Sequence, residues 1–239
     1  MPRSFRSSQQ SRVPAAAIAN TPGASKKAAR IKLKRHPSQP ASWQHGRVTS
    51  PSDSGVVAET DRIVIRPWRP EEADRLFDLL RRMEVARWIG GRPMTDREEA
   101  LVRIERWGEM LAADPRFGAW AAVERCSGIP AGTVLLKPLP DGGGEIEIGW
   151  HFHPDSWGKG LASEAAGALR ARGFAQGLDE VWAVTHLDNH PSIAVCRRIG
   201  LQLLGVTHRW YPEPSMMFWA GARDAQEPSI APDGPAPPW

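Results

Sequence analysis

The chain has 239 residues, of which 41% are hydrophobic and 24% are charged, and these proportions are typical of a soluble globular protein with one domain. Its apolar runs are all far shorter than the ~20 residues that a membrane-spanning helix needs. The two cysteines, Cys126 and Cys196, form no CxxC pair, which argues against a disulfide-stapled secreted fold and against a cysteine zinc site. We therefore expect a cytoplasmic protein without a membrane partner.

Positive charge is concentrated at the N-terminal end. Residues 1–58 hold 10 of the 31 Lys and Arg residues but only one of the 27 acidic residues, Asp53, so their net charge is +9. The other residues hold 21 basic and 26 acidic side chains, a net charge of −5. Because residues 1–58 also lack a periodic apolar pattern, they predict a disordered basic tail.

Three interpretations of this tail stay open. Its opening, MPRSFRSSQQSR, has the Arg-rich and acid-poor composition of an organelle transit peptide. The later KKAARIKLKR could bind nucleic acid or anionic lipid. The third interpretation, which we favour, is an extension without a selected role, as a start codon assigned too far upstream would add. We therefore expect no nucleic-acid partner.

Residues 59–223 predict one folded domain in which strands and helices alternate. A first helix begins near Glu71 and keeps its apolar face as far as Met83, and a second follows Thr95, which forms a capping box with Glu98. The remaining expected elements are strands at 63–65, 120–124, 132–136, 145–152, 181–185, 201–206 and 216–220, and helices at 163–174 and 192–199.

The turn at 141–144, Asp-Gly-Gly-Gly, makes its flanking strands antiparallel neighbours. The fold class is therefore α/β (α+β), with a mixed, mostly antiparallel sheet and helices on both faces. Residues 224–239 contain five prolines, too many for an interior strand or helix, and they predict a disordered C-terminal tail.

Gly158-Lys159-Gly160 stands between an expected strand and an expected helix. Glycines there let backbone N–H groups approach an anion, and the helix N-terminus adds a favourable dipole. A tight turn also requires glycine for steric reasons alone, so this motif by itself is weak evidence. A P-loop would need GxxxxGK[ST], which is absent, and a dinucleotide-binding fingerprint would need glycine in place of Ser163.

Four segments in order resemble the GCN5-related N-acetyltransferases (GNAT), in particular the ribosomal-protein (RimJ/RimL-like) branch: TDRIVIRPW, EIEIGW, HPDSWGKGLASEA and DNHPSIAVCRRIGL. The resemblance covers residues 60–220. It implies a single GNAT-like domain with a splayed strand pair, acetyl-CoA as co-substrate without a metal, and direct attack by a primary amine in a ternary complex.

The resemblance also implies which residues bind acetyl-CoA. Part of the set lies on the splayed strand, part in the pyrophosphate-binding turn and part beside the pantetheine arm: Trp150, His151 and Phe152; Trp157, Gly158, Lys159, Gly160, Leu161 and Ala162; Asn189 and Ser192. Trp157 departs from the family pattern, which has Gln or Arg at this position. Asn189 and Ser192 have an alternative interpretation, the capping of a helix.

Glu147 matches the family position of the general base that takes a proton from the ammonium group of the acceptor. Glu145 is the alternative, since it lies two residues earlier on the same strand face. Ser192 is the second catalytic candidate, because the resemblance places it near the CoA sulfur. The usual tyrosine acid is replaced by Cys196, which we expect to be a buried, inert thiol, and Tyr211, the one tyrosine of the chain, lies in a later loop.

Four histidines invite a metal interpretation: His151, His153, His186 and His190. No carboxylate completes a familiar ligand spacing, so we expect no metal.

Acceptor binding in the family involves segments that correspond here to 87–94 and 207–214. They carry mostly cationic and aromatic side chains and a single acid: Arg87, Trp88, Arg92, His208, Arg209, Trp210 and Glu213. This lining suits a protein N-terminus or an amino-acid-like small molecule. The alternative function is a non-catalytic acyl-CoA-binding module on the same fold, and we expect a monomer or homodimer.

Overall fold

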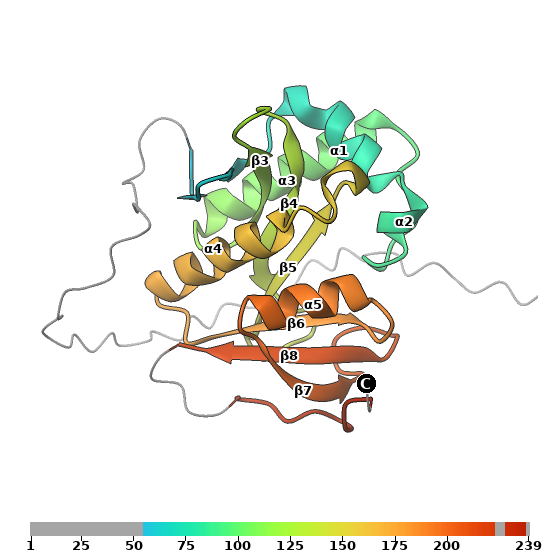
Figure 1. Ribbon diagram of the computed structural model, residues 1–239, viewed down its shortest axis with the longest axis vertical. Helices are drawn as coiled ribbons and strands as arrows, with labels where there is room; N and C mark the ends of the chain where they lie inside the picture. The colour runs from blue at the N-terminus through green and yellow to red at the C-terminus, as the bar shows by residue number, and fades with distance from the viewer. Residues whose placement is uncertain (1–54, 223–227, 238–239) are drawn as a thin grey trace, which may run out of the picture. The chain divides into compact units, whose positions relative to one another are not determined.

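A computed structural model describes residues 55–222 and 228–237 of the chain. The described residues form one sheet with its flanking helices (Figure 1). In chain order the elements are β1 (Ala58–Glu59), β2 (Ile63–Pro67), η1 (Pro70–Glu72), α1 (Ala73–Leu80), α2 (Met83–Ala86), α3 (Arg97–Ala113), β3 (Gly118–Glu124), β4 (Pro130–Pro138), β5 (Ile146–Phe152), η2 (Pro154–Ser156), α4 (Leu161–Ala175), β6 (Glu180–His186), α5 (His190–Arg198), β7 (Gln202–Thr207) and β8 (Ser215–Gly221).

The eight described strands lie in the order β1-β2-β3-β4-β5-β6-β8-β7. Among them only β5 and β6 pair in parallel, and every other neighbouring pair is antiparallel. Short turns join β3 to β4 and β4 to β5, whereas the connection from β2 to β3 contains α1, α2 and α3. The parallel pair of β5 and β6 needs a crossover, which α4 supplies. The expected mixed, mostly antiparallel sheet is confirmed.

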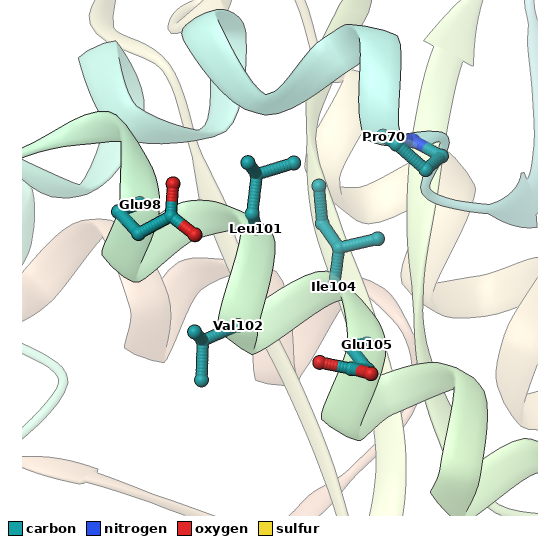
Figure 2. A pocket seen from close by; sticks show the side chains of 6 residues that line it. All are labelled: Pro70, Glu98, Leu101, Val102, Ile104 and Glu105. Carbon is teal, nitrogen blue, oxygen red and sulfur yellow. The ribbon is translucent and has the colours of Figure 1, made fainter.

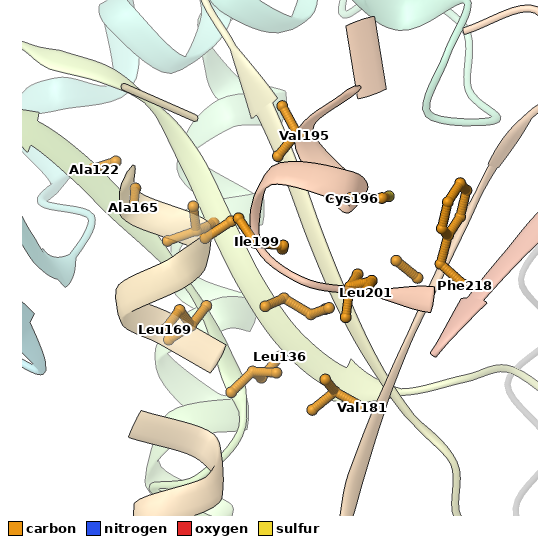
Figure 3. Close-up of a cluster of buried hydrophobic side chains, with 14 of the residues drawn as sticks. Ala122, Leu136, Ala165, Leu169, Val181, Val195, Cys196, Ile199, Leu201 and Phe218 are labelled. Atoms are coloured by element: carbon orange, nitrogen blue, oxygen red, sulfur yellow. The ribbon is translucent and has the colours of Figure 1, made fainter. Parts of the chain in front are cut away.

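Side chains alternate between the two faces of the sheet, as the period of a strand requires. On one face, α4 and α5 pack against even-numbered positions of β3, β4 and β5, which include Ile148. Leu136 is another of these positions (Figure 3). On the other face, α1 and α3 pack against odd-numbered positions such as Ala121 and Val123. A third cluster, around Trp182, Trp210 and Trp219, continues this second face beyond β5. The expectation of helices on both faces is confirmed as well.

Several element boundaries differ from those expected. Met83 does not extend the apolar face of α1, because it starts the separate helix α2 and is 59% exposed. The N-cap of α3 is Asp96 and not Thr95, since the Asp96 carboxylate accepts a hydrogen bond from the Glu99 backbone N–H at 3.0 Å. At the start of the domain, Ala58 pairs with Ile65 in β1, so the sheet begins within the expected tail. Residues 1–54 lie outside the described residues.

The C-terminal segment also differs from the expected disordered tail. Residues 228–237 pack against the edge strand β7, where Val206 and Gly234 exchange backbone hydrogen bonds. Asp233 accepts hydrogen bonds from the Thr207 hydroxyl (3.1 Å) and the His208 N–H (2.7 Å). The frequent prolines limit this pairing to one isolated bridge, because proline cannot donate to a ladder. None of the described helices is long and apolar enough to cross a membrane.

Candidate functional site

Strands β5 and β6 separate soon after they meet. Within the described residues their parallel pairing is recorded at one register position, Glu147 with Trp182, whereas β4 and β5 pair along the whole of β5. The later part of β5, which includes Trp150, His151 and Phe152, therefore has a paired side toward β4 and an open side toward β6. An extended ligand arm could enter this split and bond to the strand as an additional strand would.

The glycine turn lies beyond the C-terminal end of β5 and leads into α4. Gly158 and Gly160 have φ values of 73° and 77°, which explains the need for glycine, and Gly160 is the N-cap of α4. A Cβ at Gly158 would meet no atom within 4 Å, so the backbone is open to a ligand there. An open turn at the N-terminus of a 15-residue helix has the geometry and dipole to bind an anionic group such as a phosphate.

Trp157, which replaces the Gln or Arg of the family pattern, fastens this turn to β5. Its indole N–H donates to the Phe152 carbonyl at 2.8 Å, while the side chain remains 49% exposed. Leu161 and Ala162 follow as the first residues of α4, and Leu161 is fully buried in the core below the turn. The structure thus brings 157–162 together as one turn, with Leu161 anchoring it and Lys159 exposed on it.

A buried histidine connects the loop after β5 to α1. His153 accepts a hydrogen bond from the Asp155 N–H on Nδ1 (3.2 Å) and donates from Nε2 to the Asp78 carboxylate (2.8 Å). Burial alone would raise the pKa of the Asp78 carboxyl, but hydrogen bonds from His153, Arg82 and Arg81 hold it well below its usual range. His153 is therefore a structural link between α1 and the turn.

The other histidines do not gather around a metal. Burial, together with the charge of Arg103, lowers the pKa of His151 to about 3, so its ring is neutral. His186 lies edge-on to Trp88, with ring centroids 5.6 Å apart. In the described part of the chain no three His, Cys, Asp or Glu side chains are placed to hold a metal ion.

Glu147 is the centre of a polar cluster at the point where β5 and β6 part. Its Oε2 atom accepts from the Lys137 ammonium at 3.0 Å and from the Tyr211 hydroxyl at 3.1 Å. Lys137 is the cross-strand neighbour of Glu147 on β4, and its ammonium also donates to the Tyr211 oxygen at 3.4 Å. The Glu147 residue is only 8% exposed, so these partners hold its carboxylate in one place.

The protonation of the two partners follows from their surroundings. Burial and the negative charge of Glu147 raise the pKa of Tyr211 to about 12, so the phenol stays a hydrogen-bond donor. Burial alone would lower the pKa of Lys137, but the charge of Glu147, the interaction with Tyr211 and the hydrogen bonds to both together raise that pKa, so the ammonium stays charged. The Tyr211 hydroxyl was not expected at this site from the sequence. The one feature of the sequence that could have indicated this is that Tyr211 lies in the segment 207–214, which was expected to bind the acceptor.

Glu145, the alternative base, lies apart from this cluster. It precedes β5 in the turn after β4, and its carboxylate lies over Gly142. Asn189 caps α5, because its side-chain oxygen accepts from the Ser192 N–H at 3.2 Å. The expectation for Cys196 is confirmed, since the residue is fully buried and burial raises the pKa of its thiol.

The expected acceptor lining is present only in part. Arg87 lies over the Trp88 ring at 4.3 Å, and both remain partly or fully exposed near His186. Arg92 is instead paired with Glu99 at 2.7 Å. Trp210 is buried, with its ring 5.8 Å from that of Trp182, so it belongs to the core and not to the lining.

A separate hollow of about 380 Å³ lies between α3 and Pro70 of η1 (Figure 2). It is lined by Pro70, Glu98, Leu101, Val102, Ile104 and Glu105. None of these residues belongs to the split strands, the glycine turn or the Glu147 cluster, so the hollow is not part of the candidate site.

Comparison with known proteins gives consistent matches. A sequence model of the acetyltransferase (GNAT) domain matches residues 62–202. The uncharacterized N-acetyltransferase YoaA of Bacillus subtilis (strain 168) is 29% identical over 155 residues, which are 64% of this chain and 87% of that protein.

Two solved structures illustrate the similarity of fold. The microcin C7 self-immunity acetyltransferase MccE, in complex with acetyl-CoA and AMP, has a TM-score of 0.58 at 16% identity, covering 72% of this chain and 98% of that one. The acetyltransferase from Salmonella typhimurium that modifies the N-terminal serine of ribosomal protein L7/L12 has a TM-score of 0.57 at 17% identity. The match covers 68% of this chain and 96% of that one.

Proposed function

This chain belongs to the GNAT acetyltransferases, because the family model matches more than half of it, and we propose that it acetylates the primary amine of a protein N-terminus or an amino-acid-like molecule. One observation carries the proposal: a carboxylate, Glu147, lies where β5 and β6 part, and the split leads to an open glycine turn at a helix N-terminus. The four quoted motifs favour the ribosomal-protein branch of the family.

We assign the binding of acetyl-CoA to the turn and the split. Gly158, Lys159 and Gly160, with the first N–H groups of α4, would hold the pyrophosphate. The open side of β5 at Trp150, His151 and Phe152 would bond the pantetheine arm, with Asn189 and Ser192 of α5 nearby in the family arrangement. The bound donor supplies an acyl group activated as a thioester.

Glu147 would act as the general base. The acceptor arrives as an ammonium ion, and it becomes a nucleophile only after losing a proton. Lys137 and Tyr211 both bond to Oε2 of Glu147, so they orient the carboxylate, and the proton would move to it directly or through water. Cys196 is too deeply buried to carry the acyl group, which favours direct attack by the amine.

The acceptor class rests on an exposed cation in the segment expected to bind the acceptor. Arg87 is exposed beside Trp88, so an amine that also bears a carboxylate or phosphate suits this segment better than a polycation. Among proteins of similar fold, one was solved with AMP and another modifies an N-terminal serine.

The free thiols of Cys126 and Cys196 suit a cytoplasmic location.

Mass spectrometry after incubation with acetyl-CoA tests the proposal. The acceptors would be peptides with free N-termini, amino acids and spermidine, and we expect acetylated peptide or amino acid. Acetyl-CoA binding without any acetylated product would instead support a non-catalytic binding module. Acetylation of spermidine alone would contradict the acceptor class.

A further inference from the structure

Arg62, directly before β2, reaches the glycine turn with its side chain. Its Nη1 group donates to the Lys159 carbonyl at 3.0 Å, and its Nε group donates to Glu164, in the first turn of α4, at 2.7 Å. The remaining guanidinium nitrogen, Nη2, forms an ion pair with Oε2 of Glu164, the oxygen that also accepts from Nε. One arginine therefore bonds both to the turn and to the helix that follows it.

The other oxygen of Glu164 is held by the chain just before β2. It accepts from the Thr60 hydroxyl at 2.6 Å and from the Arg62 backbone N–H at 3.1 Å. Hydrogen bonds from Thr60 and Arg62 thus reach both oxygens of the Glu164 carboxylate and hold it in place. Although burial opposes it, the hydrogen bonds from Thr60 and Arg62 lower the pKa of Glu164, so the carboxylate stays ionised.

The bond to the Lys159 carbonyl sets the direction of a backbone donor. In a trans peptide the C=O and the following N–H point to opposite sides, and the described chain has no cis peptide bond. When the Lys159 carbonyl points at Arg62, the N–H of Gly160 points away from it. Gly160 has a left-handed φ of 77°, and glycine can adopt many other φ values at little cost. The hydrogen bond from Arg62 therefore restrains the peptide between Lys159 and Gly160, which could otherwise rotate.

Arg62 also balances the charge of Glu164. A carboxylate in the first turn of a helix lies close to the anion site and would repel a pyrophosphate. Paired with Arg62, Glu164 adds no net charge, and the positive end of the α4 dipole remains available to the ligand. Because the Arg62 side chain is half exposed, the contact adds little to the core and acts mainly on the turn.

We propose that Arg62 and Glu164 are positioning residues that hold the turn 158–160 in its pyrophosphate-binding conformation. This inference rests on the proposed function, since it requires that the turn bind CoA. It goes beyond that function in assigning a role to two residues outside the turn itself.

Calorimetric titration with two ligands tests the proposal. Acetyl-CoA carries the pyrophosphate, whereas S-acetylpantetheine contains the same thioester arm without it. We expect Arg62→Gln to raise the Kd for acetyl-CoA by about tenfold, because charge-assisted hydrogen bonds are lost from the turn, and to leave the Kd for S-acetylpantetheine unchanged. The KM for acetyl-CoA should rise in parallel while kcat at saturation stays the same. Arg62→Lys should recover part of the affinity.

Arg125→Gln is the matched control. Arg125 is similarly exposed, pairs with Glu59 at 3.0 Å and donates to the Thr60 carbonyl at 2.9 Å, but it does not bond to the turn. An equal loss of affinity for both ligands, or no loss for either, would overturn the positioning role. If the wild-type protein itself does not bind acetyl-CoA, both the proposed function and the positioning role are wrong. Thermal unfolding will show whether Arg62→Gln folds. If it does not, the Kd values for the two ligands are compared for Arg62→Lys and Glu164→Gln instead.

Discussion

Replacement of Glu147 by glutamine tests the mechanism most directly. Glutamine has the same shape, and its amide oxygen can still accept from Lys137 and Tyr211, so the contacts at 3.0 and 3.1 Å can persist without the charge. Loss of a general base lowers turnover by about 10²–10⁴-fold. We expect the lower end of this range, about 10²-fold, near neutral pH. This corresponds to about 2.7 kcal/mol in the barrier.

The effect on stability should be much smaller. Lys137 has 33% of its side chain exposed, so its ammonium can turn to water when its partner loses charge. The cost is about 1 kcal/mol or less, which lowers the Tm of a domain of this size by about 2–4 °C at most. A large loss of rate with a small loss of Tm would therefore separate chemistry from folding.

The assay is steady-state acetylation of a peptide N-terminus between pH 6 and pH 9, with the Kd for acetyl-CoA measured alongside. An α-amino group has a pKa near 8, so its neutral fraction rises from about a tenth at pH 7 to about nine-tenths at pH 9. The deficit of Glu147→Gln should shrink over this range, because the free amine then forms without help, and acetyl-CoA binding should stay nearly unchanged. Glu145→Gln, the same chemical change two residues away, is the control. Wild-type turnover of Glu147→Gln at every pH would refute the assignment of the base.

Three further predictions concern the turn, the cap and the link to α1. Gly160→Val should raise the KM for acetyl-CoA and lower the Tm, because valine is strained at a φ of 77°; an unchanged KM in steady-state kinetics would contradict a ligand at the turn. Asn189→Ala should destabilise the domain by about 1 kcal/mol through loss of the α5 cap, as urea unfolding would measure, and should also raise the KM if the side chain binds pantetheine. The folded-state pKa of Asp78 is depressed, so its stabilising contribution is present above the unfolded pKa near 4 and is lost as pH falls. Urea midpoints at pH 7 and pH 3 should therefore differ less for Asp78→Asn than for the wild type.

The sequence predicted those parts of the fold that local chemistry determines. β-branched runs specify strands such as β2, the run of glycines before β5 specifies an antiparallel turn, and Gly158 and Gly160 are required by their positive φ. The error at Met83 has a local cause as well. A periodic apolar pattern does not reveal that α1 ends at Leu80 and that the chain turns before α2 begins.

Contacts between distant segments could not be predicted in the same way. Tyr211 reaches Glu147 because β8 inserts between β6 and β7, which brings the loop before β8 back toward the middle of the sheet. Arg62 reaches Lys159 because β2 lies close to the start of α4. Both depend on the order of strands and on helix packing, which one sequence leaves open among several topologies.

The alternation of side chains along β5 suggests how the two substrates meet. Ile148 and Trp150 face α4 and α5, the side that carries the glycine turn, whereas Glu147 faces the opposite side with Tyr211 and the tryptophan cluster. A continuous sheet would keep an acyl donor on the first face away from a base on the second. The split between β5 and β6 opens directly after their paired position at Glu147 and Trp182 and removes this barrier beside Glu147. Under the proposed function, the donor would therefore enter from the α4 side and the amine from the Glu147 side, and direct transfer would require no acyl-enzyme to carry the group across the sheet.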